Sequence, residues 1–121
     1  MSNGNPDIER HCVEIRSYEL QPGSREAFHA LMRDRAIPML RSWNTDVVAF
    51  GPSPHDNDSY YLIRAYRDVD ERQASQDAFY GSDERRHGPR EAILAPIHHY
   101  TSVVLMLDDD GINALRRAHG A

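Results

Sequence analysis

The 121-residue sequence lacks the features that mark secreted and membrane proteins. It has one cysteine, so Cys12 has no partner for an internal disulfide. No apolar run approaches the roughly 18 residues that a membrane-spanning helix needs. The first ten residues, MSNGNPDIER, have neither the basic start nor the apolar core of a secretory signal. We therefore expect a cytoplasmic protein that does not bind membranes.

The sequence also lacks the charge and the motifs of several binding classes. The 14 Lys and Arg residues are outnumbered by 19 Asp and Glu residues, which gives a net charge of -5 and argues against a nucleic-acid partner. There is no G-x-G-x-x-G fingerprint and no P-loop, and no H-x-H or C-x-x-C spacing supports a metal site. We expect no cofactor and no metal.

Two short runs of residues contain side chains that commonly bind metal ions. His98 and His99 are adjacent in an expected strand and should point to opposite faces of the sheet, which disfavours a shared ion. Asp108, Asp109 and Asp110 lack the distal Glu of a calcium loop, so helix capping is the simpler interpretation.

The composition indicates one globular domain. Hydrophobic residues make up 40% and charged residues 27% of the chain, which is ordinary for a folded protein. We interpret residues 1–10 as a flexible N-terminal tail and residues 11–121 as a single domain.

The most informative stretch is residues 11–20, a strand in which two kinds of side chain alternate. These are Val13, Ile15 and Ser17 on one face, and Glu14, Arg16 and Tyr18 on the other. Pro22 and Gly23 end it. A carboxylate, a guanidinium and a phenol in a row are groups that bind, pair or catalyse when something covers them.

The remaining pattern predicts an α+β domain. Helical spacing predicts an amphipathic helix over residues 25–42 with a kink at Pro38. Further elements are expected as strands over 46–51, 59–66 and 98–107, helices over 68–80 and 91–95, and a terminal helix capped by residues 108–110. The order β-α-β-β-α-β is that of the ferredoxin-like arrangement. We predict a four-stranded antiparallel sheet in the order 4-1-3-2, with both long helices on one face.

Three other side chains receive structural interpretations. Cys12 is expected to be a small buried residue, Trp43 to pack in the core, and His29 to lie on the surface of the first helix.

Several motifs resemble the NIPSNAP family. They are E-I-R-S-Y-x-L-x-P-G at residues 14–23, the helix containing Pro38, and Ala65-Tyr66 followed by Glu71-Arg72. The resemblance covers about residues 11–107. It implies a dimeric α+β barrel in which two ferredoxin-like sheets face each other. The wider superfamily contains cofactor-independent monooxygenases, lactone isomerases, polyketide cyclases and haem enzymes, whereas NIPSNAP proteins have no generally assigned reaction.

The sequence departs from the family pattern at two places. The first helix usually ends at glycine in the family, and here Trp43 and Asn44 occupy that place. The long linker over residues 82–90 is also less typical of the family.

Seven residues should share one face of the sheet: Glu14, Arg16, Tyr18, Tyr60, Leu62, Arg64 and Tyr66. Two interpretations are open. The face is either a polar pocket or a set of cross-strand pairs, with Glu14 opposite Arg64 as an ion pair that seals a dimer. For the pocket, the candidate catalytic residues are Arg16, Tyr18 and His99. The candidate ligand-binding residues are Arg64, Tyr60, Tyr66 and Glu14.

Two functions follow from these alternatives. The first is a cofactor-independent isomerase, cyclase or monooxygenase that acts on a small organic molecule. The second is a non-catalytic homodimeric module that binds a metabolite or a protein. We expect a homodimer in both cases, because the face assigned to the side away from the helices carries Tyr18, Tyr60, Leu62 and Tyr66, and so much aromatic surface is unusual in water.

Overall fold

A computed structural model describes residues 9–80 and 90–119. The expected tail therefore lies outside the described residues as far as residue 8, and Arg10 already belongs to the first strand. Most of the linker over residues 82–90 also lies outside them. No helix in the described part of the chain has the length and apolar character needed to cross a bilayer.

The core of the fold is a four-stranded antiparallel sheet. Its strands are β1 (Arg10–Leu20), β2 (Asp46–Pro52), β3 (Ser59–Tyr66) and β4 (Ile97–Asp108). Their order is β2-β3-β1-β4, which is the predicted order 4-1-3-2 read from the other edge. The alternating sequence of β1 suits its place between two hydrogen-bonded neighbours.

The strand register confirms that the candidate residues share one face. Glu14 lies opposite Arg64, Arg16 opposite Leu62, and Tyr18 opposite Tyr60. On the other side of β1, the partners of Glu14 and Tyr18 in β4 are Val104 and Tyr100.

The first long helix runs over the predicted residues but in three segments. These are α1 (Arg25–Leu31), the π-helical turn η1 (Met32–Ala36) and α2 (Ile37–Ser42). In the π turn, the Ile37 N–H donates to the carbonyl of Met32, five residues back. Pro38 explains this distortion, because it has no N–H and its ring crowds the preceding turn. The helix ends before Asn44, whose φ of 60° lies in the left-handed region.

Three further helices lie in the described part of the chain, and two of them are capped by aspartate. They are α3 (Val69–Tyr80), α5 (Arg90–Leu94) and α6 (Asp109–Ala118). The Asp68 carboxylate accepts from the Glu71 N–H at 2.7 Å, and the Asp108 carboxylate accepts from the Gly111 N–H at 2.8 Å.

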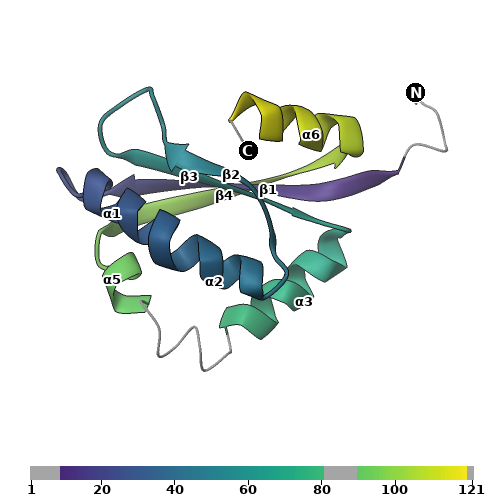
Figure 1. Cartoon of the computed structure of the whole chain (residues 1–121), viewed down its shortest axis with the longest axis horizontal. Helices are drawn as coiled ribbons and strands as arrows, with labels where there is room; N and C mark the ends of the chain where they lie inside the picture. Colours follow the sequence, from purple (N-terminus) through teal and green to yellow (C-terminus); the bar gives the residue numbers. More distant parts are fainter. Residues whose placement is uncertain (1–8, 81–89, 120–121) are drawn as a thin grey trace.

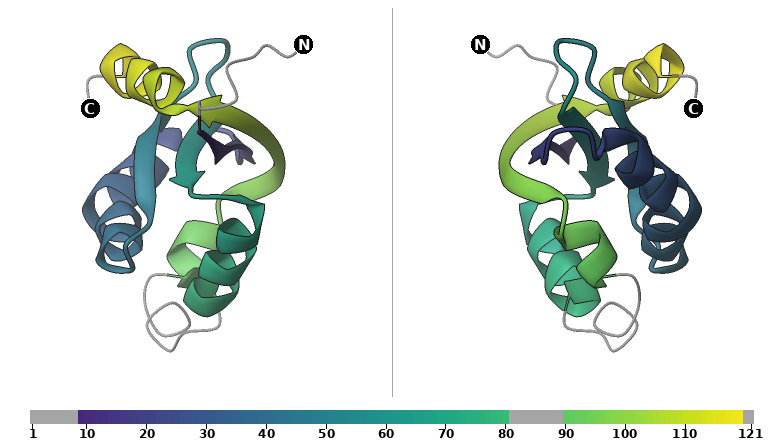
Figure 2. Two further views of the ribbon diagram at one scale, coloured as in Figure 1. Left: turned by 90° about the vertical axis from the view of Figure 1, so that its right-hand side faces the viewer. Right: turned by 90° about the vertical axis from the view of Figure 1, so that its left-hand side faces the viewer.

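The helices lie on both faces of the sheet. Figure 1 shows α1, α2, α3 and α5 on one face, as predicted for the two long helices, and α6 on the other. Figure 2 shows that the sheet is curved and that β4 bends toward α3 and α5.

The position of the aromatic face corrects one expectation. Tyr18, Tyr60 and Leu62 pack under the helices, in one core cluster with Phe28 of α1 and Phe79 of α3. They are therefore not on the side away from the helices, and the reason given for a dimer was wrong. The error arose because β1 buries both of its faces, so the side that meets the helices was assigned incorrectly.

The opposite face of the sheet forms a second core under α6. Val13, Ile63 and Ala65 are buried there against Ile112 of α6, with Leu115 at the margin. This small helix thus covers the apolar side of β1.

The expectation for Trp43 was wrong. Trp43 is 38% exposed and packs edge-on against Phe79, with ring centroids 6.0 Å apart. His29 is only partly exposed, and its Nδ1 lies 2.6 Å from the hydroxyl of buried Tyr60. Cys12 is fully buried, as expected.

Candidate functional site

A cavity of about 890 Å³ lies between the sheet and the helices. The sheet contributes the side chains of its central strands, and η1, α2, α3 and α5 contribute the facing wall. The lining residues are Arg16, Tyr18, Leu62, Arg64 and Tyr100 from the sheet, Met32, Ala36, Met39, Leu40, Gln76, Phe79, Ile93 and Leu94 from the helices, and Ile97, His98 and His99 at the start of β4.

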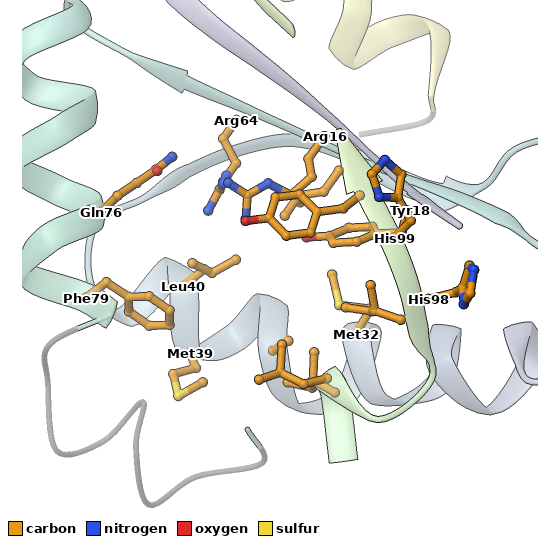
Figure 3. Close-up of a pocket in the computed structure, with 16 residues that line it drawn as sticks. Arg16, Tyr18, Met32, Met39, Leu40, Arg64, Gln76, Phe79, His98 and His99 are labelled. Atoms are coloured by element: carbon orange, nitrogen blue, oxygen red, sulfur yellow. The ribbon is translucent and has the colours of Figure 1, made fainter. Parts of the chain in front are cut away.

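The cavity has a polar side and an apolar side. In Figure 3, Arg16, Arg64 and Tyr18 lie along the sheet, and Met32, Met39 and Leu40 lie across from them on the first long helix. The alternation of β1 and β3 places the polar groups, since residues two apart in a strand share a face. Helical spacing places the apolar groups on the side of the helix that faces the sheet.

Behind the polar side, Glu14 is fully buried and accepts four hydrogen bonds. Arg16 donates to its Oε2 at 3.2 Å and Arg72 donates to the same oxygen at 2.7 Å. Arg64 and Gln76 donate to its Oε1, Gln76 at 2.8 Å. Four donors fill the approximately four acceptor positions of a carboxylate. Glu14 therefore orients Arg16, Arg64 and Gln76 rather than facing the cavity itself.

The charge state of Glu14 follows from the same contacts. Burial alone raises the pKa of this carboxyl group, but the guanidinium groups of Arg64, Arg72 and Arg16 outweigh burial and lower the pKa to about 2. Glu14 is thus ionised at neutral pH and is a poor proton acceptor. The predicted ion pair between Glu14 and Arg64 is confirmed, as part of a larger network.

Arg16 is held at several points. Besides Glu14, its Nε donates to the Ser102 hydroxyl of β4 at 3.3 Å, and its guanidinium carbon lies 4.8 Å from the centre of the Tyr100 ring. Its side chain is 13% exposed. The Tyr18 ring beside it packs against Phe28 and Tyr100, with centroids 5.7 and 6.3 Å away. Rigid placement of this kind suits a binding group.

Both histidines at the start of β4 are among the residues that line the cavity. The pairing of β1 with β4 shifts register between Glu19 and Leu20, whose partners are His99 and Ile97. This irregularity interrupts the alternation at His98. His98 lies at the margin of the cavity, since its side chain is 63% exposed and its Nε2 lies 3.9 Å from a carboxylate oxygen of Glu19. Over residues 9–80 and 90–119, no group of three His, Cys, Asp or Glu side chains is arranged to hold a metal ion.

The structure brings only some of the candidate residues to the cavity. Arg16, Tyr18, Arg64 and His99 line it, whereas Glu14, Tyr60 and Tyr66 do not. Tyr60 is buried in the core, where burial raises the pKa of its phenol, and its hydroxyl contacts His29. The Tyr66 hydroxyl accepts from Gln76 at 3.3 Å, and its ring borders a separate pocket near α6.

Sequence reasoning missed the contribution of α3. Arg72, Gln76 and Phe79 follow one another at intervals of four and three residues, so they share one face of this helix. Arg72 and Gln76 bind Glu14, and Gln76 and Phe79 line the cavity. The available signal was the polar pair Arg72 and Gln76, which helical spacing places on one face of α3.

Solved structures of similar fold come from several bacteria. An uncharacterised NIPSNAP domain protein from Burkholderia xenovorans is 21% identical, with a TM-score of 0.68 over 78% of this chain and 91% of the other. A NIPSNAP family protein from Agrobacterium tumefaciens is 16% identical, with a TM-score of 0.72 over 82% and 94%. A putative antibiotic biosynthesis monooxygenase from Nitrosomonas europaea is 18% identical, with a TM-score of 0.56 over 78% and 95%. At these identities the likeness establishes the fold alone.

Sequence comparison establishes the family. No curated protein matches the chain. The NIPSNAP family model, however, matches residues 13–96, which include β1, the first long helix, the β2–β3 hairpin and α3. This match covers well over half of the sequence and includes the strand that carries Glu14, Arg16 and Tyr18. The chain therefore belongs to the NIPSNAP family.

Proposed function

We propose that this protein binds a small organic molecule in the cavity between the sheet and the helices. The observation that carries the proposal is a cavity of about 890 Å³ with an apolar wall on one side and Arg16, Arg64 and Tyr18 on the other. Ligand pockets typically have volumes of about 300–1,000 Å³, mostly apolar walls and a few convergent polar groups.

The polar groups suit a ligand with an oxygen-centred head group. The Arg16 guanidinium offers a fixed fork of donors for a carbonyl, enolate or carboxylate oxygen. The Tyr18 hydroxyl can donate a proton or a hydrogen bond, and His99 can serve as an acid or a base. Glu14 has no such role, because its acceptor positions are filled and its pKa is about 2.

These groups support a cofactor-independent reaction as the first candidate. A developing enolate would be stabilised by Arg16 while His99 or Tyr18 moved a proton, as an isomerase or cyclase requires. Besides isomerisation and cyclisation, such an enolate could be oxygenated by O₂, which is the reaction of a monooxygenase. The neighbour from Nitrosomonas europaea that shares the fold is described as a putative monooxygenase. Fold likeness is only an analogy for function.

The second candidate is a non-catalytic homodimeric module. It is favoured by the saturation of Glu14, whose four hydrogen-bond donors leave this carboxylate without a role as a base. Binding would then use the same residues without a chemical step.

We also propose that the protein is a homodimer, for a different reason from the one expected. The edge strand β4 exposes a row of large apolar side chains that are 41–54% exposed: Tyr100, Val103, Val104, Leu105 and Met106. Such an edge is an aggregation hazard unless another chain covers it. A second copy on β4 would lie next to Tyr100, which also lines the cavity.

The test is native mass spectrometry of protein purified from its own host, for the wild type, Arg16→Met and Arg67→Met. Arg67 is the control, because its side chain is 67% exposed and does not line the cavity. We expect a retained organic molecule in the wild type and in Arg67→Met, and its loss from Arg16→Met with the dimer intact. A weakened dimer with unchanged binding in Arg16→Met would contradict the pocket.

A further inference from the structure

We propose that the ligand of this cavity is an organic acid, with its carboxylate at Arg16 and Arg64 and an apolar body against the first long helix. This inference rests on the proposed function and goes further by naming the chemical class of the ligand.

The side chains that line the cavity carry positive charge. Arg16 and Arg64 contribute fixed positive charges to the sheet side, and His98 and His99 are the other ionisable groups beside the tyrosines. No Asp or Glu is among the described residues that line the cavity. A cationic ligand would therefore meet two guanidinium groups and no carboxylate, whereas an anion would meet only favourable charges.

The charged groups around Glu14, behind the cavity wall, are also mostly positive. Within the described part of the chain, one carboxylate, that of Glu14, lies against three guanidinium groups, those of Arg16, Arg64 and Arg72. Arg64 is 1% exposed and Arg72 is 19% exposed at the side chain, so solvent screens these charges poorly. Among these described groups positive charges outnumber negative ones, which favours a bound carboxylate over a bound cation.

The apolar walls of the cavity indicate what the rest of the ligand is like. Met32, Met39 and Leu40 line the side opposite Arg16, and Phe79 closes one end of this wall. Methionine side chains are flexible and polarisable, so they adapt to apolar groups of different shape. Tyr18 and Tyr100 add flat ring surfaces beside Arg16. Together these walls fit a hydrocarbon or aromatic body attached to one acidic group, and they do not fit a highly polar molecule such as a sugar.

The experiment uses two probes of the same shape that differ in charge, namely 2-naphthoate and its neutral amide, 2-naphthamide. Their dissociation constants are measured by isothermal titration calorimetry at neutral pH for the wild type, Arg16→Met and the control Arg67→Met. We expect wild type and Arg67→Met to bind the acid about tenfold or more tightly than the amide. We expect Arg16→Met to lose this preference while it still binds the amide.

The comparison of the two probes in the wild type needs no variant, so it stands even if Arg16→Met is poorly folded. Equal affinity of the wild type for acid and amide would overturn the acid class and leave the proposed small-molecule function intact. A full preference for the acid in Arg16→Met would overturn the assignment of the carboxylate to Arg16. If neither probe bound, both this inference and the proposed function would be rejected.

Discussion

The polar side of the cavity depends on Glu14. It is fully buried, and its four hydrogen-bond donors come from β1, β3 and α3. Removing one member of a buried ionic group leaves the others uncompensated and typically costs about 3–5 kcal/mol. Glu14 therefore has a structural role in placing Arg16 and Arg64, and its effect on binding is indirect.

Replacing Glu14 by Gln should lower the free energy of unfolding at pH 7 by about 3–5 kcal/mol, since three guanidinium groups then surround a neutral amide. Urea denaturation measures this change. The matched control is Glu26→Gln on the exposed side of α1, which should stay within about 0.5 kcal/mol of the wild type. Similar losses in both variants would show that the Glu14 network adds nothing to stability.

The low pKa of Glu14 predicts an acid-sensitive part of the stability. The pKa lies at about 2 in the folded protein, below its ordinary value of 4.5, so the ionised carboxylate stabilises the fold above pH 4.5. That contribution, about 3 kcal/mol, should disappear as the pH falls from 4.5 toward 2. Urea titrations at several pH values should show this loss in the wild type and its absence in Glu14→Gln. An equal acid dependence in both proteins would mean that another group titrates.

At the scale of elements, alternation and helical spacing predicted most of the fold. The range of β3 and the cap at Asp108 match the sequence pattern. The first long helix covers the predicted residues, but its π-helical turn was not predicted. Local pattern does not reveal where a strand pairs irregularly, so the register shift beside His98 at the start of β4 was not predicted.

The sequence pattern also identified only part of the site. A strand shows which residues share a face but not which face meets the helices when both faces are buried, as in β1. Arg16 and Tyr18 were identified from the alternation of β1, whereas the contribution of Gln76 on α3 was found only in three dimensions.

The cap of α6 gives a prediction at this scale. Replacing Asp108 by Ala removes the acceptor for the Gly111 N–H and should cost about 1 kcal/mol in urea denaturation. Asp110→Ala is the control, because Asp110 is exposed in the first turn of α6 and contributes only through the helix dipole. If Asp110→Ala were as destabilising as Asp108→Ala, the hydrogen-bonded cap would not be the source of the stability.

At the scale of the whole molecule, the account requires a partner for β4. Light scattering at micromolar concentration should give about twice the chain mass of 13.8 kDa. Val103→Asp places a charge in the exposed apolar row and should shift the mass toward that of one chain, whereas Ala27→Asp on the exposed side of α1 should not. A wild-type mass of one chain would refute the dimer.

The central claim, a ligand held between the sheet and the first long helix, is tested most directly by NMR of protein labelled with ¹³C at the methionine methyl groups. Met32 and Met39 line the cavity, and Met106 on β4 does not, so the protein carries its own internal control. The account predicts that saturating 2-naphthoate shifts the Met32 and Met39 resonances, with intermolecular contacts to the ring protons, and leaves Met106 unchanged. Shifts at Met106 with none at Met32 and Met39 would contradict it.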